Sequence, residues 1–457
     1  MSETIQLLDD NSMQCFIRDG YVKLKVDFPK SFHDAIHRKT EEMFEKVGNP
    51  GNNLLPRIPE LQRVWGHPAV HGALASILGK DYYLHPHRHC HENPPGSSDQ
   101  QMHKDSLHNS RFAVDGNHRH HHTRWAMAFY YPQDTPIEMG PTAIWPRTQY
   151  FNAKPPLGEA EEVPLFGEAG TVVVVHYDVF HRKMRNTANK ARYMIKFLFT
   201  RMSEPQSASW NHQRQDWKSS EDLQENLWQS MWNWHHGGNG NGQHTLLAES
   251  SIAELRKKLQ DSSETVGLNV AYELGQIGSD ALPVLIDALT DENEVVCRNA
   301  MYGFNVLGEK AVPVLIDALH HSSEEIRARA ADTLGDIGLK AQDAIGDLIQ
   351  TLADESKDVR SHVAEALGTI AQTSAVAVRP LIDRLTDDEE LVRRNVSLSL
   401  ARIGKHAAEV APALGRALRD NSHFVRAFSG EALERIGTPE AMGILLSHLK
   451  TARWCKG

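Results

Sequence analysis

A repeated phrase in the second half of the chain restricts the fold more than any other feature. The segment ALPVLIDAL at residues 281–289 returns almost unchanged as AVPVLIDAL at residues 311–319. Its last leucine then recurs in steps of about 33 residues, at Leu352, Leu385 and Leu418. A basic residue follows each acidic turn, at Arg327, Arg360, Arg393 and Arg426. Each unit predicts two short helices that cannot bury their apolar faces alone, so the units must stack into an α-solenoid.

These units resemble the short HEAT repeats related to phycobilisome-lyase HEAT units. The resemblance covers about residues 249–450, or roughly six units. Repeat arrays of this kind bind partners through extended surfaces, so a protein partner on the array is one expectation.

The first half of the chain has a different composition. Residues 1–248 hold 20 of the 26 histidines and eight of the nine tryptophans, with 26 basic and 27 acidic side chains. Residues 249–457 hold 23 basic and 32 acidic side chains. The segment GGNGNG at residues 237–242 is typical of a flexible linker. We therefore expect a domain at residues 1–236 with a tryptophan-rich extension at 203–236, a linker at 237–248, and the solenoid at 249–457.

Composition also limits the class of protein. The net charge of −10 argues against a general nucleic-acid binder. No apolar run approaches the length of a membrane helix, so we expect no membrane association. Four widely separated cysteines favour neither a disulfide framework nor a paired-cysteine zinc site, and they are typical of a reducing cytoplasm.

Short apolar runs between Pro, Gly and Asn clusters predict β-structure from Tyr82 to Val175. The clearest predicted strands span residues 124–131, 142–145, 171–175 and 193–200. Residues 29–47 and 66–79 are predicted to be helices. The run TVVVV at 171–175 is too apolar for a surface strand and should lie in the core.

The segment QMHKD at residues 101–105 offers candidate metal ligands. In an extended segment, His103 and Asp105 leave the same face of the backbone. A distant histidine would complete the facial triad of non-haem Fe(II) oxygenases, and His181 follows a buried strand. The residues also allow a second set, His176, Asp178 and His181. The set split between two strands is favoured, because one short stretch leaves little room for a rigid three-dimensional site.

Several phrases of the first half resemble the phytanoyl-CoA dioxygenase family of Fe(II)/2-oxoglutarate oxygenases, over about residues 10–200. They are FIRDGYV at 16–22, HPAV at 67–70, ILG at 77–79, NPPG at 93–96, GPTAIWP at 140–146 and GTVVVV at 170–175. The resemblance implies a double-stranded β-helix, a jelly-roll or cupin-like fold, with flanking helices. It also implies that His103, Asp105 and His181 bind Fe(II) and that Arg192 holds the distal carboxylate of 2-oxoglutarate.

The chain departs from the family pattern at two places. Gln149 stands where the family usually has histidine, and Lys183 stands where it often has a small hydroxyl residue. A further group of histidines alternates along a predicted strand at His85, His87, His89 and His91. The simplest interpretation of these four histidines is that they form a polar wall of the barrel. The simplest interpretation of His118, His120, His121 and His122 is that they belong to a solvated loop. His87 and His89 are the candidates for binding an anionic substrate.

The function that this resemblance implies is an Fe(II)-, 2-oxoglutarate- and O2-dependent dioxygenase. Asp105 keeps the carboxylate that a related halogenase lacks, so hydroxylation is expected rather than halogenation. A small-molecule or carrier-tethered substrate is the first expectation, with the HEAT array as a docking or supporting module. The alternatives are a protein side-chain hydroxylase that recruits its substrate through the array, and a catalytically silent scaffold.

Overall fold

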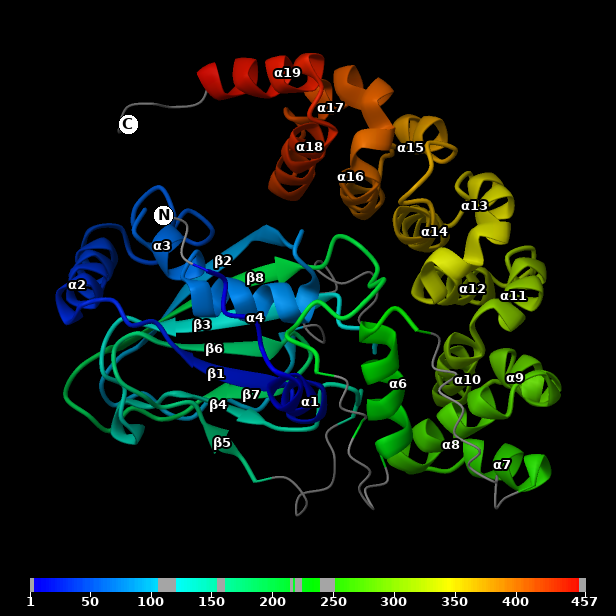
Figure 1. Cartoon of the computed structure of the whole chain (residues 1–457), viewed down its shortest axis with the longest axis horizontal. Helices are drawn as coiled ribbons and strands as arrows, with labels where there is room; N and C mark the ends of the chain where they lie inside the picture. Colours follow the sequence, from blue (N-terminus) through cyan, green and yellow to red (C-terminus); the bar gives the residue numbers. More distant parts are fainter. Residues whose placement is uncertain are drawn as a thin grey trace. The chain divides into compact units, whose positions relative to one another are not determined.

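The computed structural model describes residues 4–105, 121–153, 161–213, 217, 224–238 and 251–451 (Figure 1). The chain divides into two compact units. One comprises Met1–Glu221 and Met231–Gly238, and the other comprises Asp222–Ser230 and Asn239–Gly457. Most of the predicted linker, and His118 and His120 of the predicted loop, lie outside the described residues. In the described part of the chain, no helix is both long enough and apolar enough to span a bilayer.

The first unit is built on two antiparallel sheets. The larger sheet has the strand order β1-β6-β3-β8-β2 and the smaller sheet has the order β5-β4-β7. The strands are β1 (Tyr21–Lys25), β2 (Tyr83–Asn93), β3 (Trp125–Tyr131), β4 (Thr142–Trp145), β5 (Val163–Pro164), β6 (Thr171–His176), β7 (Phe180–Lys183) and β8 (Arg192–Thr200). After β3 the chain crosses between the two sheets four times, from β3 to β4, from β5 to β6, from β6 to β7 and from β7 to β8. This connectivity is that of a double-stranded β-helix, as the family resemblance implies.

The core of this unit consists of apolar side chains from both sheets. Every residue of β6 is buried, which confirms the prediction from its valine run. The core side chains include Met127, Phe129 and Tyr131 of β3, Ile144 of β4, Val173 and Val175 of β6, and Leu198 of β8. Residues of β3 and β6 that alternate along their strands meet here on one face, as the pleat of a strand requires.

Helices flank the larger sheet (Figure 1). They are α1 (Asp10–Asp19), α2 (Lys30–Val47), α3 (Leu61–Trp65) and α4 (Pro68–Leu78). Helix α6 (Glu225–His235) comes later in the chain and is divided between the two units. The apolar helix α4 contacts β1, β3, β6 and β8. Asp9 caps α1 by accepting a hydrogen bond from the Ser12 backbone N–H (2.8 Å). Gly20 ends α1 in the left-handed region at φ 82°.

The second unit contains the repeated helix pairs. Its helices are α7 (Ile252–Leu259), α8 (Glu264–Ile277), α9 (Leu282–Leu289), α10 (Glu294–Leu307), α11 (Val312–Ala318), α12 (Glu324–Ile337), α13 (Ile345–Thr351), α14 (Lys357–Ile370), α15 (Val378–Arg384), α16 (Glu390–Ile403), α17 (Ala411–Ala417), α18 (His423–Ile436) and α19 (Pro439–Lys450). The even-numbered helices from α8 to α18 stack on one another in chain order (Figure 1). The helical half is therefore an α-solenoid, in agreement with the repeat.

A ladder of ion pairs joins neighbouring repeats. Arg360 donates from Nε (2.9 Å) and from a terminal nitrogen (3.0 Å) to the carboxylate of Asp387 in the next unit. It also donates to the Asp354 and Glu355 carbonyls of its own turn. The same bidentate arrangement is made by Arg327 with Asp354 and by Arg393 with Asp420. The recurring arginines thus fix each turn to the next repeat.

Candidate metal centre

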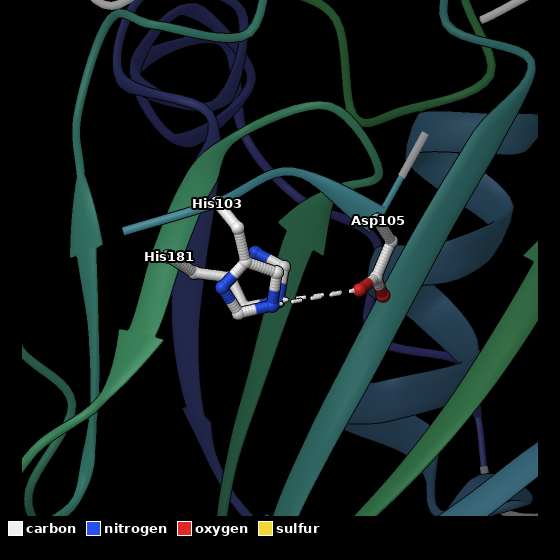
Figure 2. Close-up of side chains that lie close together, drawn as sticks. All are labelled: His103, Asp105 and His181. Atoms are coloured by element: carbon white, nitrogen blue, oxygen red, sulfur yellow. Dashed lines mark ion pairs between the residues drawn. The ribbon is translucent and has the colours of Figure 1, made fainter. Parts of the chain in front are cut away.

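Strand pairing brings two of the predicted iron ligands together. His103 and His181 form an antiparallel bridge in which each backbone N–H donates to the other's carbonyl, at 3.0 and 2.9 Å. Residues directly opposite in such a pair project from the same face of the sheet. Asp105 lies two residues beyond His103, and its carboxylate turns toward the two imidazole rings (Figure 2). Among the described residues, these three are the one group of three or more side chains placed to hold a metal ion, with ligand atoms within 4.8 Å of one another.

Hydrogen bonds fix which ring nitrogen of each histidine faces the centre. His103 Nδ1 lies 2.9 Å from the Gln101 carbonyl oxygen, and His181 Nδ1 lies 3.1 Å from the Val179 carbonyl oxygen. A carbonyl can only accept, so both Nδ1 atoms carry hydrogen and both Nε2 atoms present a lone pair. Backbone carbonyls orient metal-binding histidines in this way in many proteins. The two Nε2 atoms lie 3.8 and 3.7 Å from Asp105 Oδ1, too far for hydrogen bonds but close enough to share one ion.

The protonation states also suit a divalent cation. Burial lowers the pKa of His181 to about 4, so the ring is neutral near pH 7. Burial would raise the pKa of Asp105, but the charge of Lys196 and the hydrogen bond that Lys196 donates hold it well below its usual range. The donor set is thus two imidazoles, each with its Nε2 toward the carboxylate, and one carboxylate, which fits Fe(II).

Lys196 on β8 is the partner of Asp105 in this structure. Its ammonium donates to Asp105 Oδ2 at 2.8 Å, and both side chains are largely buried. The opposite oxygen, Oδ1, faces the two histidines. Lys196 therefore neutralises the buried carboxylate while leaving one oxygen directed at the metal position.

A cavity of about 370 Å³ opens beside the three ligands. Its lining includes the ligands together with His91, Thr142, Lys183, Arg192, Met194 and Lys196. Arg192, Met194 and Lys196 alternate along β8, so that the three side chains share one face of the strand.

Arg192 is a buried cation on this cavity. Its side chain donates to the Gly140 carbonyl from two nitrogens (3.1 and 2.9 Å) and to the His91 carbonyl (3.4 Å). Within the described part of the chain, no carboxylate forms an ion pair with it. Burial lowers the pKa of Arg192, since a charged group is costly to desolvate. A carboxylate ligand entering the cavity would supply the missing counter-charge.

The predicted substrate-binding histidines do not line the cavity. Of the alternating histidines on β2, His91 lines the cavity, whereas His87 and His89 do not. His89 Nε2 contacts the Asn49 side-chain nitrogen at 3.0 Å. His176, from the alternative ligand set, accepts a hydrogen bond at Nδ1 from the Asp178 backbone N–H (3.2 Å).

Gln149, the first departure from the family pattern, has a structural role in this chain. Its side-chain nitrogen donates to the Ile17 (2.8 Å) and Arg18 (3.2 Å) carbonyls at the end of α1. It is not among the residues that line the cavity, whereas Lys183, the second departure, is among them.

Lys196 is not among the site residues predicted from the sequence. A usable signal was present, because Lys196 is the one charged side chain in the otherwise apolar and aromatic run YMIKFLF at residues 193–199. Period-two alternation from Arg192 would have placed it on the cavity face.

Comparisons with known proteins identify HEAT repeats in the second half of the chain. The HEAT-repeat family matches residues 312–401 and 378–454. No curated protein matches the chain. Among solved structures, the chain is similar to SnoK from nogalamycin biosynthesis, a non-haem alpha-ketoglutarate-dependent carbocyclase. The two share 15% identity over 43% of this chain and 85% of that one, with a TM-score of 0.35.

Two further solved structures are similar to the chain. EctD from S. alaskensis, with bound Fe, has 13% identity over 43% of this chain and 77% of that one, with a TM-score of 0.37. AviO1 from Streptomyces viridochromogenes Tue57 has 14% identity over 43% of this chain and 96% of that one, with a TM-score of 0.33. From its own topology and the family match, the chain joins a double-stranded β-helix to HEAT repeats.

Proposed function

We propose that the chain is an Fe(II)- and 2-oxoglutarate-dependent dioxygenase that hydroxylates a small-molecule or carrier-tethered substrate. The observation that carries this proposal is the His103, Asp105 and His181 group, in which both histidines are already oriented with Nε2 toward the carboxylate. Three protein ligands on one side of an ion leave positions for the co-substrate and dioxygen.

One set of residues would bind the metal and another would bind the co-substrate. His103, Asp105 and His181 would hold the ion, and Arg192 would pair with the distal carboxylate of 2-oxoglutarate through a charge-assisted bond. Bound iron supplies oxygen activation coupled to oxidative decarboxylation of 2-oxoglutarate to succinate. Phe129 and Met194 add apolar surface to the otherwise largely polar lining of the cavity.

The primary substrate would occupy the part of the cavity that 2-oxoglutarate leaves free. The volume of about 370 Å³ is at the lower end of the range for small-molecule sites, so a small group or the end of a tethered chain fits best. We assign the HEAT array the role of docking a carrier or partner, since stacked repeats present long continuous surfaces.

Iron retention and succinate formation test the proposal directly. We expect Asp105→Ala and His103→Ala to abolish both, while the variants keep the circular dichroism spectrum of the parent protein. Asp178→Asn is the matched control, because Asp178 belongs to the alternative ligand set, and it should retain iron and turnover. Normal activity in Asp105→Ala, with loss in Asp178→Asn, would transfer the centre to His176 and Asp178. Iron binding without any succinate formation would instead support a catalytically silent scaffold.

A further inference from the structure

Two histidines outside the candidate iron centre bring their ring nitrogens together. His212 lies in the tryptophan-rich extension after β8, and His236 directly follows α6. Their Nε2 atoms lie 3.2 Å apart, and their ring centroids are separated by 4.4 Å. The rings of His103 and His181 in the candidate iron centre have nearly the same separation, 4.6 Å.

The surrounding hydrogen bonds determine the protonation of both rings. His236 Nδ1 lies 2.8 Å from the Trp232 carbonyl oxygen, which can only accept. His212 Nδ1 lies 2.8 Å from Asp10 Oδ1. Asp10 also accepts hydrogen bonds from Trp210 Nε1 (2.6 Å) and from the Gln213 backbone N–H (3.0 Å). Asp10 is therefore a carboxylate, and both Nδ1 atoms carry hydrogen.

In neutral rings, the two Nε2 atoms would thus point lone pairs at each other. Such a contact is repulsive unless a cation lies between the nitrogens. That cation is either a shared proton or a metal ion. Two Zn–N bonds of about 2.0–2.1 Å at a tetrahedral angle separate the nitrogens by about 3.3 Å, close to the observed 3.2 Å.

The second contact of each ring also matches a metal site. Metal-binding histidines commonly donate their other N–H to a carboxylate or a backbone carbonyl. His212 donates to the carboxylate of Asp10, and His236 donates to the carbonyl of Trp232. Asp10 is 2% exposed, so its position is fixed by the packing of α1.

We propose that His212 and His236 bind a divalent transition metal ion such as Zn2+ or Cu2+, at a site separate from the iron centre. In the described part of the chain no third His, Cys, Asp or Glu joins the pair, so water would complete the coordination. The His212 side chain is 25% exposed, which gives solvent access.

The proposed ion would fasten the extension to α1. The extension already contacts the start of the chain, where the Asn211 backbone N–H donates to the Leu8 carbonyl (2.8 Å). A metal on His212 and His236 would add a link between this segment and the end of α6, and Asp10 would tie that link to α1. This inference is independent of the proposed oxygenase activity.

Zinc titration of the full-length, metal-free protein by calorimetry tests the site. We expect the parent protein to bind two Zn2+ ions, one at each centre. His236→Gln and His212→Gln should each bind one, and Asp105→Ala should also bind one, but at the other centre. His406→Gln, which removes an exposed histidine of the array, is the matched control and should bind two.

Copper provides a second readout that is local to the site. The Trp210 and Trp232 rings lie 4.7 and 4.8 Å from the His236 ring, so bound Cu2+ should quench tryptophan emission. The quenching should persist in Asp105→Ala and disappear in His236→Gln. Asp10→Asn keeps both rings and should weaken Cu2+ binding about 10- to 100-fold. This variant tests the site if a histidine variant fails to fold. Equal zinc stoichiometry in the parent and both histidine variants would overturn the proposal. A protein that binds no zinc at His212 and His236, and in which the two rings share a proton at neutral pH, would also overturn it.

Discussion

At the residue scale, the charge on Asp105 controls the candidate iron centre. In the metal-free protein its buried carboxylate is balanced by Lys196 at 2.8 Å. An incoming cation would lie near that ammonium and be repelled by it, while gaining the attraction of the carboxylate. Lys196 therefore stabilises the empty centre and opposes the filled one.

We predict that Lys196→Met destabilises the metal-free protein by about 3–5 kcal/mol, because removing one partner leaves a buried unpaired charge. Added metal should then raise the melting temperature more in Lys196→Met than in the parent, since the ion replaces the lost counter-charge. The double variant Lys196→Met/Asp105→Asn removes both charges and should recover most of the stability. Thermal unfolding with and without Mn2+ measures all three. An equal metal-induced shift in the parent and in Lys196→Met would contradict this account.

A second prediction concerns the effect of Arg192 on the KM for 2-oxoglutarate. Replacing it with leucine should raise the KM for 2-oxoglutarate more than tenfold, because losing one partner of a buried charged pair costs about 2–5 kcal/mol. Arg192→Lys keeps the charge but loses the bidentate geometry, and should give an intermediate KM. Succinate release at varied 2-oxoglutarate concentration separates these outcomes. An unchanged KM in Arg192→Leu would remove Arg192 from the co-substrate site.

The sequence predicts the features of this site that depend on residues close together in the chain, but not those that depend on tertiary contacts. The i, i+2 spacing of His103 and Asp105 is local, and the valine run before His181 predicts a buried strand. The antiparallel register that joins His103 to His181 is a tertiary feature, and only the family resemblance pointed to it. The contact between His212 and His236 was not predictable, because it needs Asp10, the extension and the end of α6 to meet in space.

At the element scale, the arginine ladder holds consecutive repeats together. The arginines were visible in the sequence as a recurring basic position. Their partners Asp354, Asp387 and Asp420 recur with the same period, but the pairing crosses from one repeat to the next. Only the stacked structure shows that the acidic turn of one unit receives the arginine of the unit before it.

We predict that Arg360→Met lowers the stability of the array by about 1–3 kcal/mol, between the values for exposed and for fully buried pairs. Arg426→Met is the matched control. Arg426 donates to the Asp420 and Asn421 carbonyls of its own turn, and among the described residues it has no carboxylate partner. Urea unfolding followed by circular dichroism gives the difference between the two variants, which isolates the contribution of the ion pair. Equal losses would show that the turn carbonyls, rather than Asp387, account for the stabilisation.

Acid should weaken the same ladder. Burial would raise the pKa values of Asp354, Asp387 and Asp420, but hydrogen bonds from arginine and from the backbone hold them below the ordinary 3.8. Because the unfolded chain binds protons first as pH falls, this stabilisation is complete above the ordinary pKa and is lost as pH drops through the lower folded values. We expect the free energy of unfolding to fall below about pH 4, with a shallower slope in Asp387→Asn. An identical slope in that variant would exclude the ladder as the acid-sensitive element.

At the scale of the whole molecule, the domain boundary at residues 237–248 stays a prediction, because most of that segment lies outside the described residues. Composition and the GGNGNG segment favoured a boundary at residues 237–248. The structure groups Asp222–Ser230 with the array and Met231–Gly238 with the barrel, so the division runs through α6. Trp228 and Trp232 lie four residues apart and share one face of α6, but this spacing carries no information about which core receives that face.

The last prediction concerns whether the barrel folds without the array. We expect a fragment of residues 1–238 to fold and to bind iron and 2-oxoglutarate, because the three candidate ligands, Arg192 and the apolar core between the sheets all lie within it. It should decarboxylate 2-oxoglutarate slowly without a primary substrate. If the array docks the substrate, efficiency toward a large or tethered substrate should fall through a higher KM, with little change in kcat.

A fragment of residues 1–221 provides the comparison. It keeps the candidate iron ligands but lacks Trp232 and Trp234, which are buried at 4% and 8% exposure. Each fully buried aromatic side chain contributes about 1.5–3 kcal/mol or more, so this shorter fragment should unfold at a lower temperature while still binding iron. Calorimetric unfolding of the full chain and both fragments measures the difference. An insoluble or iron-free 1–238 fragment would show that the array supports the barrel structurally, and the docking role would then be abandoned.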